Sequence, residues 1–182
     1  MTINKSALRE LYDISEMEYL DRESAAPIYE CQADLIKQQE LVGIVDVGCR
    51  VGKINAYLTD HDYRYYGFDT SPEPISYAIS AYPSKIFEVQ SWHDPVLPYF
   101  KIDVILFSSV LIYADDPIAM FEKLCAFYQP KVAIIHEINN QNTADFNYID
   151  LGYFTDKYPC DRYEFDLDIP CGHRTILNAQ YQ

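Results

Sequence analysis

The residues best suited to chemistry lie together in segment 45–53, which reads VDVGCRVGK and follows an apolar run. Gly48 and Gly52 let a ligand approach the backbone closely, because glycine adds no side chain to a turn. Asp69 follows Gly48 by 21 residues. At that spacing an acidic side chain can accept hydrogen bonds from a ribose diol. The pattern therefore predicts a site for a ligand that contains a nucleoside.

The glycine spacing separates two classes of nucleoside cofactor. A dinucleotide-binding G-x-G-x-x-G motif needs glycines at 48, 50 and 53, but the last two positions are Arg50 and Lys53. A D-x-G-x-G-x-G motif fits better, because it matches Asp46, Gly48 and Gly52. Only its middle glycine is replaced, by Arg50. The segment therefore disfavours a nicotinamide dinucleotide.

With this turn and with Asp69, the chain resembles the class I S-adenosylmethionine-dependent methyltransferases over about residues 41–181. The stretch 108–117, SSVLIYADDP, falls where that family has a further motif. In the small-molecule branch the motif often reads V-L-x-H-x-x-D-P, and Tyr113 stands in the place of its histidine. The predicted antiparallel hairpin at the end of the chain also matches, because the family's sheet ends with an antiparallel strand.

The resemblance implies S-adenosylmethionine as the cofactor. Asp46 would take its ammonium group, directly or through a water molecule, and Asp69 would take the ribose diol. Gly48 and Gly52 would let the methionine part pass close to the backbone, and Ser108 would lie near the methionyl end. The residues expected near the adenine are Phe68, Thr70, Ser91 and Trp92.

Three further side chains have more than one interpretation. Arg50 could reach the cofactor carboxylate, point outward or occlude the site. Tyr113 and His93 are the candidate catalytic residues, which would orient or deprotonate the acceptor. The alternatives are that Tyr113 packs beneath the N-terminal helices and that His93 is a structural polar group. The implied methyl transfer is an in-line displacement, so a base is needed only for an acceptor that arrives protonated.

The elements that position these residues follow from the apolar pattern. Short apolar runs alternate with helical stretches, which predicts an α/β fold with a doubly wound, Rossmann-like and mostly parallel sheet. Strands are expected at 41–47, 65–69, 85–89, 102–108 and 131–138. Two more runs, 162–169 and 174–181, are separated by a gap too short for a crossover, so they predict an antiparallel hairpin. The sheet would have about seven strands.

Helices are expected before and between these strands. Residues 1–40 are expected to form a helical cap of three short pieces. Residues 41–182 are expected to form the core of the same single domain. The apolar face of the third piece would hold Ile28, Cys31, Leu35 and Ile36. After the first strand, a helix would carry Ile54, Tyr57 and Leu58. Ser71 would cap the next helix, and a later one would open at Asp116 and Pro117 with a core face of Met120, Phe121, Leu124 and Tyr128.

Charge and composition narrow the class of partner. The 182 residues carry 14 basic and 28 acidic side chains, a net charge of −14, and both flanking segments, 1–40 and 143–182, are acidic. This charge repels phosphate backbones and disfavours a nucleic-acid substrate. No apolar run is long enough for a membrane span and the first residues lack a signal-peptide core, so we expect a cytoplasmic protein. The five cysteines form no C-x-x-C pair, which predicts reduced thiols and no metal site.

Three functions remain open at this point. A small-molecule methyltransferase is the leading hypothesis. A protein methyltransferase is the second, because an acidic chain would suit a basic substrate. The third is a methyltransferase-like binding or scaffold module without activity, which Arg50 in the glycine turn suggests.

Overall fold

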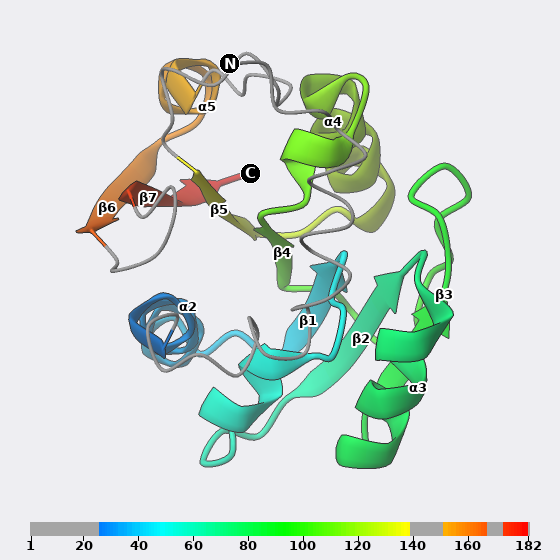
Figure 1. Cartoon of the computed structure of the whole chain (residues 1–182). Coiled ribbons are helices and arrows are strands. Elements are labelled where there is room, and N and C mark those ends of the chain that lie inside the picture. Colours follow the sequence, from blue (N-terminus) through cyan, green and yellow to red (C-terminus); the bar gives the residue numbers. More distant parts are fainter. Residues whose placement is uncertain (1–25, 139–150, 167–172, 182) are drawn as a thin grey trace, which may run out of the picture.

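The computed structural model of the chain describes residues 26–138, 151–166 and 173–181 (Figure 1). The first two predicted helical pieces, the stretch 143–150 and the turn of the predicted C-terminal hairpin lie outside the described residues.

A seven-stranded sheet forms the centre of the protein, in the order β3-β2-β1-β4-β5-β7-β6. Strands β1 to β5 are parallel, whereas β7 runs antiparallel to both β5 and β6. The strands are β1 (Gly43–Val47), β2 (Arg64–Asp69), β3 (Ile86–Val89), β4 (Val104–Ser108), β5 (Val132–Ile138), β6 (Cys160–Asp166) and β7 (His173–Gln180). All seven predicted strands are confirmed, and so is the mostly parallel, doubly wound fold class.

Helices cover both faces of this sheet (Figure 1). One face carries α2 (Ala26–Gln38), the 3-10 helix η2 (Lys53–Tyr57) and α3 (Pro72–Ala81). The other carries α4 (Pro117–Tyr128) and α5 (Leu151–Lys157), with the short 3-10 helix η3 (Leu111–Tyr113) before α4. Among the described residues, no helix combines the length and the apolar character that crossing a membrane requires.

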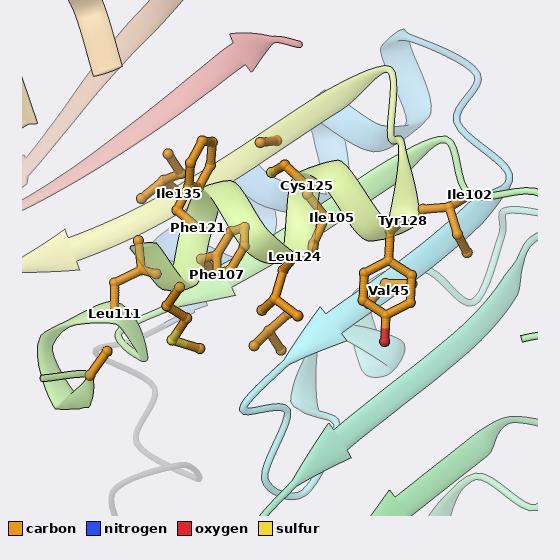
Figure 2. Packing of buried hydrophobic residues seen from close by; sticks show 14 of the residues in the cluster. Val45, Ile102, Ile105, Phe107, Leu111, Phe121, Leu124, Cys125, Tyr128 and Ile135 are labelled. Carbon is orange, nitrogen blue, oxygen red and sulfur yellow. The ribbon is translucent and has the colours of Figure 1, made fainter. Parts of the chain in front are cut away.

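Helix α4 forms as its sequence predicts. The carboxylate of Asp116 accepts a hydrogen bond from the Ala119 N–H at 2.9 Å, and Pro117 occupies the first turn. Figure 2 shows its apolar face lying on the strands. Phe121 is the centre of this contact, with ring centroids 5.3 Å from Phe107 and 4.8 Å from Phe154. The core face predicted for this helix, Met120, Phe121, Leu124 and Tyr128, is buried.

The predicted face of α2 is confirmed for Ile28, Leu35 and Ile36, and Cys31 packs against the same cluster. Cys31 is only partly buried, whereas Gln32 and Ala33 are fully buried. Ile28 and Ile36 lie four residues either side of Gln32 and are buried as predicted. A polar side chain therefore occupies the centre of the face that meets the sheet.

Two other local predictions are corrected. The segment after β1 is not an α-helix but the five-residue 3-10 helix η2. Its geometry is fixed by Asn55, whose side-chain amide donates to the Gly52 carbonyl at 2.8 Å and whose side-chain oxygen accepts from the Tyr63 hydroxyl. Ser71 does stand at the N-cap of α3, but its side chain makes no capping hydrogen bond. Its N–H instead donates to the carboxylate of Asp69 at 2.9 Å.

Candidate functional site

The glycine turn lies at the carboxyl end of β1, where the chain changes its direction of winding across the sheet. Strand β1 has β2 on one side and β4 on the other, and both neighbours are parallel to it. Their carboxyl ends therefore meet at one edge. In open α/β sheets this switch point is where ligands bind.

Two positions of the turn require glycine for steric reasons. Gly48 and Gly52 both have a φ of 66°, a left-handed conformation that other residues rarely adopt. A Cβ at Gly48 would lie 2.5 Å from Cγ2 of Val110, and one at Gly52 would lie 2.6 Å from Cε1 of Phe87. The glycines therefore allow the turn to pack against the loop after β4 and against β3.

Arg50 has a left-handed backbone like that of Gly48 and Gly52. Its φ is 49°, which is also left-handed and costs a non-glycine residue about 1–2 kcal/mol. Its N–H donates to Oδ2 of Asp69 at 3.2 Å. This hydrogen bond ties the turn to the end of β2.

The Asp69 carboxylate is held by two backbone groups. Oδ2 accepts from the Arg50 N–H, and Oδ1 accepts from the Ser71 N–H. Each carboxylate oxygen has a second lone pair, so both oxygens can still accept from a diol. The glycine turn and the predicted ribose contact thus form one preorganised unit.

Asp46 is buried and faces a tyrosine. Its side chain is 5% exposed, and its Oδ2 accepts a hydrogen bond of 2.6 Å from the Tyr65 hydroxyl. Tyr65 reaches it by crossing Gly67, which pairs with Asp46 in the sheet. A Cβ at Gly67 would come within 3 Å of the Tyr65 ring and hydroxyl and of the Cys49 sulfur. The missing side chain therefore makes room for this contact.

The charge on Asp46 depends on pH near neutrality. Burial raises the pKa of Asp46 to about 7, and the negative charge of Asp69 adds to the rise, whereas the hydrogen bond from Tyr65 opposes it. Burial also raises the pKa of Tyr65 and of Cys49 well above their usual values, so both remain neutral donors. A cation at this position would favour the ionised carboxylate.

Of the residues predicted near the adenine, Phe68 and Thr70 lie at the end of β2, and Ser91 and Trp92 follow β3. Ser91 and Trp92 are partly buried, and Thr70 is exposed. His93 is exposed and stacks on Trp92 with ring centroids 3.8 Å apart. Phe68, by contrast, packs within the core and offers no exposed ring.

Lys123 connects this loop to α4. Its ammonium donates to the backbone carbonyl of His93 at 2.5 Å and lies 5.6 Å from the Trp92 ring centroid. The His93 imidazole is therefore not needed for that link. The role of His93 in chemistry remains a prediction.

The second catalytic candidate, Tyr113, stands at the end of η3 with 59% of its surface exposed. It is therefore not packed into the core of the described residues. The loop that carries it is fixed to β5, because the Leu111 N–H donates to the buried carboxylate of Glu137 at 3.0 Å and the Ser109 N–H donates to the His136 carbonyl at 2.7 Å.

Ser108, the residue predicted near the methionyl end of the cofactor, ends β4. Its hydroxyl accepts a hydrogen bond of 2.7 Å from the Nε2 of Gln32 on α2. The other end of that side chain, Oε1, is buried and has no hydrogen-bond partner among the described residues. Such an orphaned acceptor fits a ligand that brings a donor.

The sequence analysis missed Tyr65 and Gln32. Gln32 had a readable signal, because it lies at the i+4 spacing between Ile28 and Ile36, inside the apolar face of its helix. Tyr65 had none, since only the strand register places it beside Asp46.

Together these groups fit the parts of S-adenosylmethionine. Asp46 and the Gln32 carbonyl can accept from an ammonium, the glycine turn leaves the backbone open, and Asp69 can accept from a diol. The four described cysteines are free, and within the described ranges no cluster of three or more His, Cys, Asp or Glu side chains could hold a metal ion.

The sequence matches the model of a protein family. The model of a family described as "Methyltransferase domain" matches residues 19–174. No curated protein matches the sequence.

Several solved structures share the fold. The N-methyltransferase NodS from Bradyrhizobium japonicum WM9, in complex with S-adenosylhomocysteine, is 12% identical with a TM-score of 0.72, over 89% of this chain and 90% of that chain. Magnesium protoporphyrin IX methyltransferase (ChlM) from Synechocystis PCC 6803, with bound S-adenosylhomocysteine, is 13% identical with a TM-score of 0.73, over 98% of this chain and 100% of that chain. The plantazolicin methyltransferase BpumL, in complex with S-adenosylhomocysteine, is 15% identical with a TM-score of 0.65, over 98% of this chain and 91% of that chain. At these identities the likeness shows the fold.

Proposed function

Because the chain belongs to the methyltransferase domain family, we propose that it transfers the methyl group of S-adenosylmethionine to a small-molecule acceptor. The family predicted from the sequence is thereby confirmed. NodS, ChlM and BpumL support the choice of cofactor, because each of these similar structures contains its demethylated product.

One observation of this structure carries the proposal. The Asp69 carboxylate accepts hydrogen bonds from Arg50, in the glycine turn, and from Ser71, at the start of α3. This arrangement holds the predicted diol contact beside the turn before any ligand arrives. Arg50 was the reason to consider an inactive scaffold, but its backbone is left-handed like that of the two glycines of the turn. The geometry therefore favours the enzyme.

When bound, S-adenosylmethionine would supply an electrophilic methyl carbon, which the acceptor atom takes as the carbon–sulfur bond breaks and S-adenosylhomocysteine is left. Asp46 would bind the ammonium, and Asp69 the ribose diol. Tyr113 and His93 would orient the acceptor, or remove its proton where it carries one. Most of the acceleration would then come from positioning, which suits a site without a catalytic triad.

The names of the similar structures favour a small acceptor. ChlM is named for magnesium protoporphyrin IX, and BpumL for plantazolicin. A basic protein substrate is the alternative, because a net charge of −14 would attract one. A solvated acidic surface is the commoner meaning of such a charge.

Isothermal titration with S-adenosylmethionine and S-adenosylhomocysteine tests the cofactor. We expect both to bind the wild-type protein, and Asp69→Asn to bind them about 10–100-fold more weakly through loss of the charged acceptor. Absence of binding to the wild type at millimolar ligand would overturn the proposal.

A screen of acceptors with a labelled methyl group then separates the two substrate classes. Label should enter small nucleophiles and not Lys- or Arg-rich peptides. Transfer to peptides alone would replace the small-molecule proposal with the protein one. The Asp69→Asn variant serves as the control for transfer that does not depend on the site.

A further inference from the structure

Gln32 is a polar side chain at the centre of an apolar helix face. Ile28, Leu35 and Ile36 of α2 pack on the sheet in one cluster with Ile44 and other buried residues. Gln32 lies between them in the helix and is completely buried. A carboxamide in such surroundings needs hydrogen bonds at both of its ends.

Only one end of the Gln32 side chain is satisfied by the described residues. The Nε2 group donates to the Ser108 hydroxyl at 2.7 Å, which fixes the orientation of the carboxamide. The Oε1 atom has no hydrogen-bond partner within the described part of the chain. A ligand that carries a hydrogen-bond donor would satisfy this buried acceptor.

The register of the sheet puts Ser108, the partner of this carboxamide, on the same face of the sheet as Asp46. Asp46 in β1 pairs with Leu106 in β4, and Ser108 lies two residues beyond Leu106. Side chains two residues apart on a strand point to the same face of a sheet. Gln32, through its contact with Ser108, and Asp46 therefore share the face that α2 covers, at the ends of neighbouring strands.

We propose that the side-chain carbonyl of Gln32 binds the ammonium group at the methionyl end of S-adenosylmethionine, together with the Asp46 carboxylate. This inference rests on the proposed function. The ammonium is the only hydrogen-bond donor at that end of the cofactor, and its three N–H groups suit more than one acceptor.

The other donors of the cofactor belong to the opposite side of β1. The ribose diol is assigned to Asp69 at the end of β2, which lies two strands from β4. Neighbouring strands are about 4.8 Å apart, so Ser108 is about 10 Å from that position across the sheet. Gln32 therefore contacts the amino-acid part of the cofactor and not its nucleoside.

The assignment gives α2 a part in cofactor binding. This helix precedes the first strand and contributes no residue to the glycine turn. Through Gln32 it would supply one of two acceptors for the ammonium, so the docking of the helix and the binding of the methionyl end would support each other.

The test compares two ligands that differ only in the amino-acid part. S-adenosylhomocysteine has the ammonium, whereas 5′-methylthioadenosine keeps the nucleoside and the thioether but lacks it. Titration at pH 8 should show that Gln32→Met binds S-adenosylhomocysteine about 10–100-fold more weakly than the wild type, through loss of an acceptor for a charged donor. Its affinity for 5′-methylthioadenosine should stay within about twofold, because that ligand makes no such contact.

Two further variants keep the test interpretable. Ser108→Ala removes the group that orients the carboxamide and should show the same selective loss in weaker form. Gln39→Met is the matched control, because the Gln39 amide contacts Leu35 and Asn178 at the far end of α2. It should bind both ligands as the wild type does. Thermal unfolding of each variant checks that it is folded.

Either of two results would overturn the inference. One is wild-type affinity of Gln32→Met and Ser108→Ala for S-adenosylhomocysteine. The other is a folded Gln32→Met protein whose affinity falls equally for both ligands, which would mean that Gln32 only supports the structure. A wild-type protein that binds neither ligand would instead overturn the proposed function, and this inference with it.

Discussion

The Tyr65 hydroxyl donates a 2.6 Å hydrogen bond to the carboxylate of Asp46, and both side chains are buried. The contact crosses Gly67, where a side chain would block it. This tyrosine stabilises the ionised form of a carboxyl group whose pKa burial still raises to about 7 in the presence of that hydrogen bond. Proton binding at Asp46 is therefore expected to compete with the binding of a cationic ligand.

The affinity for S-adenosylhomocysteine should depend on pH. Its ammonium binds the ionised carboxylate of Asp46, whose pKa is about 7, so one proton must leave when the ligand binds below that pH. The affinity should fall about tenfold for each pH unit below 7 and level off above it. Titrations across this range measure the slope. 5′-Methylthioadenosine should show no such slope, and a flat profile for S-adenosylhomocysteine would refute the assignment of Asp46.

Tyr65→Phe should move this profile to higher pH. Removing the hydroxyl takes away the hydrogen bond that lowers the Asp46 pKa, so the midpoint should rise by up to about one pH unit. Binding at pH 9 should approach that of the wild type. Tyr63→Phe is the matched control, because it removes a buried tyrosine hydrogen bond to Asn55 instead. Equal loss of affinity at every pH would make the role of Tyr65 purely structural.

Asp46→Asn should stabilise the fold while it weakens cofactor binding. The pKa of this carboxyl rises from 3.8 to about 7 on folding, so its contribution to stability decreases as pH rises through that window and stays constant above it. At pH 8 the neutral amide should raise the free energy of unfolding by about 1–4 kcal/mol. Urea unfolding at pH 4 and pH 8 checks the sign, since the gain should nearly vanish at pH 4.

Gly48→Ala should damage the turn for two separate reasons. The left-handed φ of 66° costs about 1–2 kcal/mol, and the added Cβ would overlap Cγ2 of Val110. We expect a loss of about 2–4 kcal/mol in the free energy of unfolding and weaker binding of both ligands. The double variant Gly48→Ala/Val110→Ala removes the overlap but not the strain. Thermal unfolding should therefore show partial recovery, and no recovery would mean that the backbone strain alone is responsible.

Tyr113→Phe and His93→Ala should lower turnover without changing cofactor affinity. Tyr113 is exposed on η3, and the backbone link from Lys123 to His93 survives loss of the imidazole. Loss of a residue that acts as the base should lower kcat about 100-fold and leave the Kd for S-adenosylhomocysteine unchanged. Once an acceptor is identified, unchanged turnover would remove that residue from the mechanism.

Much of the fold could be predicted because its signals are local. Alternating apolar runs indicated all seven strands, and the Asp116 cap with Pro117 marked the start of α4. The hairpin followed from the short gap between its two strands. These features depend on residues a few positions apart, so the sequence displays them directly.

The glycine turn and Asp69 could be found in the sequence, but their relationship could not. Spacing suggested a nucleoside site and left Arg50 with three interpretations. The structure shows that the Arg50 backbone adopts the left-handed conformation and donates to Asp69. This hydrogen bond joins the glycine turn after β1 to the end of β2, 19 residues further on, and no local pattern encodes it.

The sequence by itself determined the fold class, the family and the edge of the sheet at which a ligand would bind. Only the tertiary structure brought Tyr65 to Asp46 and Gln32 to Ser108, the latter pair 76 residues apart. Periodicity reveals which face of an element is buried, because burial repeats along the chain. The partner that a buried polar atom meets depends instead on strand register and helix docking, which form only when the whole domain folds.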